Sequence, residues 1–133
     1  EDSEAGNIVA GQDMLHFIVE MGETCLVGVT FAQRLLCAIT GDILNSKGAG
    51  VERRGDDLFV GGGKLSVSVA TVSPVSGLIH LGINVTAEGV PVKAACLAEL
   101  GIDPAWLASE VLSRFAAEVE SCLRASRKVR SVE

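Results

Sequence analysis

The sequence predicts an α+β fold in which an antiparallel sheet is packed by helices. Three observations support this: helical periodicity before Gly48, alternation between Val51 and Thr86, and helical periodicity again up to Ser126. Helices, then a meander of strands, then a helix is an order typical of α+β domains. The 133 residues suit a single domain, 1–133. Because the chain opens "EDSEAGNIVAG" without an initiator Met, a fragment lacking an N-terminal portion is also expected.

Composition restricts the partners of this domain. Apolar residues make up 48% of the chain, but it has only one Trp and four Phe, so the core must use Val, Leu, Ile and Ala. The net charge of −6 argues against nucleic acid or an anionic membrane as a partner. The four cysteines lack metal-ligand spacing and the chain has only two histidines, so we expect the cysteines to be small core residues rather than zinc ligands, and we assign no residue to a metal site from them. Without a signal peptide or a membrane-length apolar run, we expect a cytoplasmic location.

Three helical segments are predicted. The first covers 12–22, with Met14, Phe17, Ile18 and Met21 on one face, and His16 is interpreted as structural. The second begins at an N-cap Thr30 and stops near Gly48. Its apolar stripe comprises Phe31, Leu35, Ile39 and Leu44. After a short helical turn at 97–101, Asp103 caps a third helix with Pro104 at its first position. The expected buried face of that helix comprises Trp106, Leu107, Val111, Leu112, Phe115, Val119 and Cys122.

The strands follow from alternation between apolar and polar residues. The predicted strands are Val51–Arg54, Asp57–Val60, Lys64–Val72 and Ser76–Thr86, with a short extended piece at Val90–Lys93. Gly61–Gly63 is predicted to form a turn. It does not precede a helix, so a phosphate-binding glycine loop is the weaker interpretation.

A row of polar residues on the two long strands suggests a site. If the fully apolar rows share the core, Leu65 lies opposite Ile83. Lys64 then faces Asn84, Ser66 faces Gly82, and Ser68 faces His80. This register would give one sheet face a shallow polar floor headed by a lysine, which can bind a phosphate or polarise a carbonyl. An ordinary solvent-facing side of the sheet explains the same pattern.

The "RRGDD" segment at 53–57 is a second candidate. A charged turn with mutual screening is the simplest interpretation. A functional interpretation places Arg53 or Arg54 on an anionic ligand and Asp56 or Asp57 on a metal or a ligand amine.

These segments resemble a known superfamily. "RGDDLFVGGGKLSVSVAT" is similar to the central hairpin of biotin and lipoate protein ligases, and "GLIHLGINV" to their following strand. Most of the chain, including "DMLHFIVE" and "VPVKAACLAELGI", looks like the uncharacterised domain of unknown function family 366. The resemblance implies a ligase-like fold related to the catalytic core of class II aminoacyl-tRNA synthetases, with ATP and Mg as candidate cofactors.

The resemblance also implies site roles. Lys64 matches the ligase lysine that contacts the acyl carbonyl and α-phosphate, Asp57 matches an Asp near the nucleotide and metal, and Asn84 lies close to the adenylate. Asp56 stands where the ligases have Asn, and Val67 replaces a glycine and narrows the pocket. The Arg/Gly-rich adenylate loop of the ligases has no match in this sequence.

Three functions are compatible with these observations. The first is an enzyme that joins a small carboxylic acid to AMP, with Lys64 as the catalytic residue. The second is a module that binds a nucleotide or a small acid without chemistry. The third is a homo-oligomeric structural protein whose polar sheet face is an interface. In the first two, the ligand-binding residues would be Arg53, Arg54, Asp57, Ser66, Ser68, His80 and Asn84.

Overall fold

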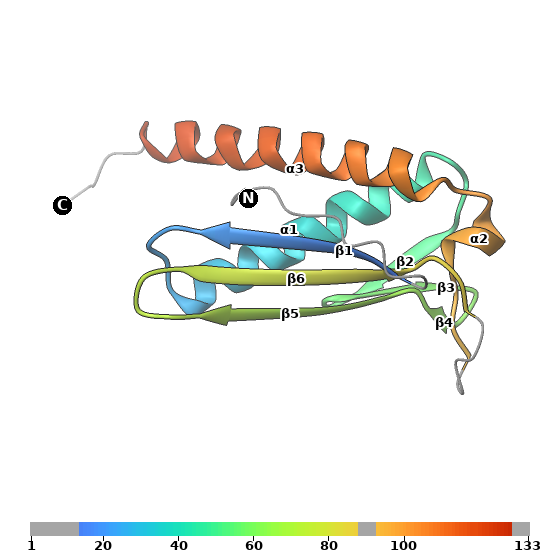
Figure 1. The fold of residues 1–133 in the computed structure, drawn as a ribbon. Helices are drawn as coiled ribbons and strands as arrows, with labels where there is room; N and C mark the ends of the chain where they lie inside the picture. The colour runs from blue at the N-terminus through green and yellow to red at the C-terminus, as the bar shows by residue number, and fades with distance from the viewer. Residues whose placement is uncertain (1–13, 88–92, 129–133) are drawn as a thin grey trace.

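The computed structural model describes residues 14–87 and 93–128 and shows two small sheets beside two long helices (Figure 1). The strands are β1 (Met14–Met21), β2 (Val51–Arg54), β3 (Asp57–Val60), β4 (Gly63–Lys64), β5 (Ser66–Val72) and β6 (Gly77–Asn84). The helices are α1 (Leu26–Asn45), α2 (Leu97–Leu100) and α3 (Pro104–Ser126). The predicted α+β class with antiparallel strands is confirmed.

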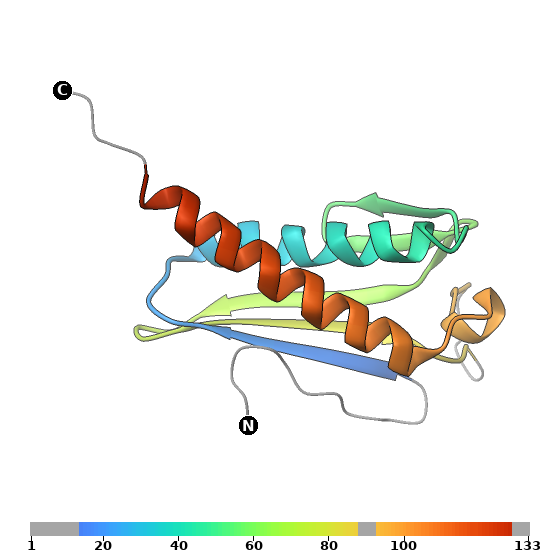
Figure 2. The ribbon, with the colours of Figure 1, turned by 90° about the horizontal axis from the view of Figure 1, so that it is seen from above.

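The larger sheet has the strand order β1–β6–β5, and the smaller has the order β2–β3–β4. All of these pairings are antiparallel. Helices α1 and α3 contact each other and lie on the same side of the larger sheet, α1 over β5 and β6 and α3 over β1 (Figure 2). The core fills the space between these helices and the sheet, and includes Phe17, Leu36, Leu81, Leu107 and Val111.

The prediction of a helix at 12–22 is wrong, because Met14–Met21 forms strand β1. The segment alternates: Leu15, Phe17 and Val19 are buried, whereas His16 and Ile18 are more exposed. An apolar residue at every second position fits a strand with one buried face. The same residues also satisfy a short helical stripe, which is why periodicity alone misassigned them.

Helix α1 starts four residues before the predicted Thr30, and Cys25 is its N-cap, with Sγ accepting from the backbone N of Gly28 at 3.4 Å. The predicted apolar stripe is confirmed except at Phe31: Leu44 is buried and Leu35 and Ile39 pack against the core, whereas Phe31 is 71% exposed. Val29, Leu36 and Cys37, which lie outside the predicted stripe, are also buried. Helix α1 is long and apolar enough to cross a membrane by length and composition alone. A helix that packs in the core of a globular protein meets the same two criteria, and one side of α1 is buried.

Helix α3 begins as predicted. Asp103 accepts a hydrogen bond from the backbone N of Ala105, and Pro104 opens the helix. Leu107, Val111 and Phe115 are buried, but Cys122 is exposed, contrary to the prediction. Cys25 is also exposed, so only two of the four cysteines are core residues, Cys37 and Cys96.

The predicted strands 51–54 and 57–60 are confirmed with their bounds. Gly61 and Gly62 form the predicted turn with positive φ angles of 58° and 81°, which glycine adopts without strain. The extended piece predicted at Val90–Lys93 lies almost wholly outside the described residues.

The strand predicted at Lys64–Val72 is interrupted at Leu65. Leu65 and Ser66 are both buried, at 0% and 1% exposure, although consecutive side chains of a regular strand point to opposite faces. The backbone N of Leu65 donates to the carbonyl of Leu58, and its carbonyl accepts from the backbone N of Asn84. Leu65 therefore joins the two sheets, with Lys64 in the smaller sheet and Ser66 in the larger.

The interruption shifts the register by one residue, so the predicted pairing is wrong. Ser66 lies opposite Ile83, Val67 opposite Gly82, and Val69 opposite His80. Ser66 and Ser68 consequently face the helices, whereas the two valines face away from them. The predicted polar floor does not form on the side of the sheet that faces away from the helices.

Candidate functional site

The side of the larger sheet that faces away from α1 and α3 is a mostly apolar surface, which we call the open face. Its residues are Met14, His16, Ile18 and Glu20 of β1, Leu78, His80, Gly82 and Asn84 of β6, and Val67, Val69 and Thr71 of β5. Ile18, Val67, Val69 and Leu78 are between 37% and 55% exposed. Aliphatic side chains exposed together on a sheet are unusual for a purely solvated surface and favour a binding role.

Two histidines meet on the open face. His16 Nδ1 lies 2.8 Å from His80 Nε2, the separation of a hydrogen bond between the rings. His80 was a predicted site residue, whereas His16 was missed because its segment was assigned to a helix. The signal that could have found it is the alternation of "MLHFIVEM", which puts His16 and Ile18 on the face opposite Phe17.

Gly82 lies beneath this pair and is covered by its neighbours. A Cβ atom there would meet Met14 Cε at 2.8 Å, His16 Nδ1 at 3.4 Å and Val67 Cγ2 at 3.5 Å. Glycine at this position therefore allows side chains from both flanking strands to close over β6. The open face is filled at this point rather than hollowed as expected from the sequence.

The exposed face of the smaller sheet is charged and adjoins the open face through Leu65. Lys64 Nζ lies 3.3 Å from Asp57 Oδ1, and both side chains are partly exposed. Arg54 lies over the ring of Phe59, 4.6 Å from its centroid, and pairs with Glu52 at 3.2 Å. Because Leu65 points into the core, Lys64 points away from it, toward solvent.

Asn84 connects the two faces. Its Nδ2 donates to the carbonyl oxygens of Lys64, at 3.2 Å, and of Ala95, at 3.1 Å. The backbone N of Ala95 donates in turn to the carbonyl of Lys64. Asn84 therefore fixes the backbone that carries the lysine.

Ser66 and Ser68, two predicted site residues, have structural partners instead. Ser66 Oγ accepts from the backbone N of Leu58 at 3.1 Å. The side chain of the buried Gln33 donates to Ser68 Oγ at 2.9 Å and to Asp56 Oδ2 at 3.3 Å. These bonds tie α1 and the β2–β3 turn to β5, on the helix side of the sheet.

Cys37 belongs to the same region. Burial raises the pKa of its thiol to about 11, and the neighbouring Asp56 acts in the same direction, whereas a hydrogen bond with Ser68 opposes the rise. A thiol with this pKa is protonated at neutral pH, so Cys37 is a poor nucleophile.

The two predicted arginines lie on opposite sides of the smaller sheet. Arg53 donates to the carbonyl of Gly55 at 2.7 Å and lines a cavity of about 290 Å³ between α1 and β2. Arg54 lies on the charged face with Asp57 and Lys64. The structure therefore brings Arg54, Asp57 and Lys64 together, and places Arg53 elsewhere.

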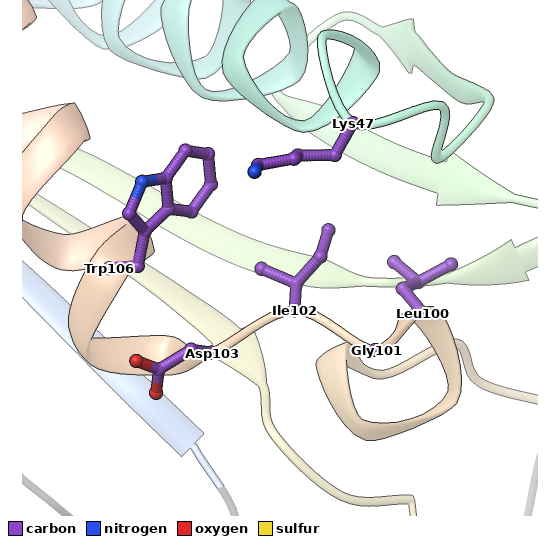
Figure 3. Close-up of a pocket in the computed structure, with 6 residues that line it drawn as sticks. All are labelled: Lys47, Leu100, Gly101, Ile102, Asp103 and Trp106. Carbon is purple, nitrogen blue, oxygen red and sulfur yellow. The ribbon is translucent and has the colours of Figure 1, made fainter.

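A separate cavity of about 270 Å³ lies between the end of α1 and the α2–α3 connection (Figure 3). Its lining residues are Lys47, Leu100, Gly101, Ile102, Asp103 and Trp106. Lys47 Nζ lies 4.7 Å from the ring centroid of Trp106, and Asp103 serves as the N-cap of α3. Since both charged groups already have partners within the protein, this cavity is a weaker candidate than the open face.

The described residues contain no group of three or more His, Cys, Asp or Glu able to hold a metal ion. Asp57 provides one carboxylate near Lys64. Mg²⁺ often binds to only one or two protein carboxylates when substrate phosphates supply other ligands. A magnesium ion carried by a nucleotide would fit here, but a metal site made by the protein alone would not.

The fold is that of biotin and lipoate protein ligases. A biotin protein ligase of Aquifex aeolicus, solved with biotin and ATP, superposes with a TM-score of 0.62 at 18% identity, covering 80% of this chain and 50% of that one. A proposed lipoate protein ligase of T. acidophilum, solved with lipoic acid, gives 0.62 at 13% identity, covering 79% and 51%. At such identities the likeness shows the fold alone.

The chain belongs to the DUF366 family, a domain of unknown function whose model matches residues 1–130. An uncharacterized protein of Methanocaldococcus jannaschii is 36% identical over 123 residues, which cover 90% of this chain and 56% of that protein. A protein of unknown function from Pyrococcus horikoshi superposes with a TM-score of 0.86 at 42% identity, covering 90% of this chain and 65% of that one. The chain therefore spans between half and two thirds of the length of these relatives.

Proposed function

We propose that this protein binds a small carboxylic acid, or its adenylate, against the open face, with Lys64 holding the carboxylate or phosphate oxygens. The observation that carries the proposal is the Lys64–Asp57 pair, at 3.3 Å, beside an exposed apolar surface of the same fold in which ligases bind biotin or lipoic acid. An ammonium group at the end of an apolar surface suits an acid with a hydrocarbon body, because each part meets its preferred surroundings.

The Lys64–Asp57 pair suits a ligand that arrives and leaves. Both side chains are partly exposed, so solvent screens their attraction and the pair contributes little to stability. Asp57 instead holds the ammonium in place before binding. An incoming carboxylate or phosphate can then share the lysine without the cost of ordering its long side chain.

Formation of an acyl-adenylate is the catalytic extension of this proposal. ATP with Mg²⁺ would be the cofactor, Lys64 the catalytic residue that stabilises charge on the α-phosphate, and Asp57 the magnesium contact. No segment of the sequence resembles the arginine–glycine adenylate loop of the ligases. Binding without chemistry is therefore the alternative. A cytoplasmic location and self-association stay predictions of the sequence.

The test combines binding with pyrophosphate exchange. We expect octanoate, lipoate or biotin to bind in calorimetry, and we expect Lys64→Ala to weaken that binding about tenfold to a hundredfold, as loss of a hydrogen bond to a charged group does. Lys128→Ala, which removes an exposed lysine near the end of α3, is the matched control and should bind like the parent protein.

The outcomes separate the hypotheses. Exchange of labelled pyrophosphate into ATP that depends on one of these acids supports the enzyme, whereas binding without exchange supports the binding module. If none of the acids binds and Lys64→Ala changes only the oligomeric mass, the proposal is rejected in favour of a structural interface.

A further inference from the structure

The number of protons on the His16–His80 pair determines which ligand groups the pair can bind. The ring centroids are 4.9 Å apart, much farther than the 2.8 Å between the facing nitrogens, so the rings meet through their edges. One facing nitrogen must donate and the other must accept. In the neutral pair, therefore, the two outer nitrogens, His16 Nε2 and His80 Nδ1, comprise one donor and one acceptor.

One added proton changes this arrangement. The hydrogen bond between the rings is kept, both outer nitrogens become donors, and the pair carries a single positive charge. A second proton would place hydrogens on both facing nitrogens and break the pair. The singly protonated pair is thus the form that matches an anion, with two charge-assisted donors.

The surroundings favour a response to anions. Ile18 and Val69 flank the pair on the open face, so a charge bound there is less screened than in bulk water. Among the described residues of the open face, the only other titratable group is Glu20, which lies opposite Leu78, beyond the pair. The residues that β5 presents to this face, Val67, Val69 and Thr71, carry no charge, and Lys64 with Asp57 lies at the other end.

The pair also lies at a useful distance from Lys64. Asn84, whose side chain bonds the backbone of Lys64, follows Gly82 by two residues and His80 by four residues on β6. At a rise of about 3.3 Å per residue, the pair is roughly 7 to 13 Å along the sheet from the lysine end. An extended chain of about eight carbons covers that span.

We propose that the His16–His80 pair binds a second carboxylate, at the end of the ligand remote from Lys64, and takes up one proton from solvent as it does so. The preferred ligand is accordingly a dicarboxylic acid of medium length rather than a simple fatty acid. This inference rests on the proposed function, since Lys64 holds the first carboxylate.

Octanedioate and octanoate form a matched pair of probes, because they differ only in the second carboxylate. Binding of each is measured by calorimetry between about pH 6 and 8, in buffers that differ in ionisation enthalpy, so that the number of protons taken up is obtained. We expect octanedioate to take up close to one proton and to weaken up to about tenfold per pH unit as the pH rises. Octanoate should show neither effect.

His80→Gln and His16→Gln test the assignment, since an amide keeps a donor and an acceptor but gains no charge. Each variant should bind octanedioate with the affinity of octanoate and take up no proton. If a variant does not fold, the comparison of the two acids on the parent protein still decides.

Octanedioate binding no tighter than octanoate at pH 6, without proton uptake, overturns this inference while leaving the proposed function intact. Failure of both acids to bind overturns the proposed function and the inference with it. Unchanged proton uptake in the glutamine variants would also overturn it, because the proton would then bind elsewhere.

Discussion

The hydroxyl of Ser66 accepts a 3.1 Å hydrogen bond from the backbone amide of Leu58, at the buried junction of the two sheets. Ser66→Ala leaves that amide without this acceptor in a buried setting, which costs about 1–3 kcal/mol of unfolding free energy. We expect the midpoint of urea unfolding to fall accordingly, with no change in ligand affinity. Ser113→Ala, at an exposed position of α3, should stay within about 0.5 kcal/mol of the parent. A loss of ligand affinity in Ser66→Ala without a loss of stability would return this serine to the site.

Gly63 is required by the close approach of another backbone. A Cβ atom there would lie 3.0 Å from both the carbonyl carbon of Ala94 and the backbone N of Ala95. Gly63→Ala must therefore push apart the segments around Lys64 and Ala94, which we expect to cost about 1–3 kcal/mol.

Gly22→Ala is the matched control for this change, because nothing lies within 4 Å of its Cβ position. Urea unfolding of both variants measures the difference. Equal stabilities would show that residues 94 and 95 move aside without cost.

The four cysteines are expected to react in two classes. Cys25 and Cys122 are exposed, whereas Cys37 and Cys96 are buried. Because the pKa of Cys37 is raised to about 11, its thiolate is scarce at pH 8 and its alkylation should be slow. Iodoacetamide followed by mass spectrometry should label two cysteines rapidly in the native protein and four in denaturant. Rapid labelling of Cys37 in the native state would contradict this placement.

Stability should fall as the solution is acidified through the titration of His80. Burial lowers the pKa of His80 below 6.5, and the charge of His16 acts in the same direction. Below pH 6.5 the unfolded chain then binds a proton more readily than the folded protein, so the unfolding free energy decreases until the folded histidine also titrates.

His80→Gln should remove part of that slope, as measured by urea unfolding at a series of pH values. Above about pH 7.5, where the histidine is neutral in both states, the parent and the variant should show the same dependence on pH. A slope that is identical in both proteins below pH 6.5 would assign the effect to other groups.

The sequence predicted the elements with strong local signals. Asp103 and Pro104 marked the start of α3, and the hairpin of β2 and β3 followed from alternation around a turn. The family and the fold were also predicted correctly, because the segments "RRGDDLFV" and "LIHLGINV" are distinctive.

The site was predicted only in part, for two physical reasons. First, "MLHFIVEM" satisfies both periods over so few residues that only pairing with β6 decides between them. Second, Leu65 and Ser66 both point inward. This break in the alternation depends on the contact of Ser66 with Leu58, so no local sequence pattern predicts it. The sequence correctly predicted that Lys64, Asp57 and Asn84 lie close together. It assigned Ser66 and Ser68 to the wrong side of the sheet.

The position of β1 has a consequence for how the protein reaches its fold. β1 starts at Met14 but pairs with β6, which ends at Asn84, and the His16–His80 contact spans 64 positions of sequence. The larger sheet cannot close during synthesis until residue 84 has left the ribosome, although α1 can form much earlier. Loop closure of this length slows folding, so the pairing of β1 with β6, which brings the two histidines together, should be one of the slower steps in assembling the domain.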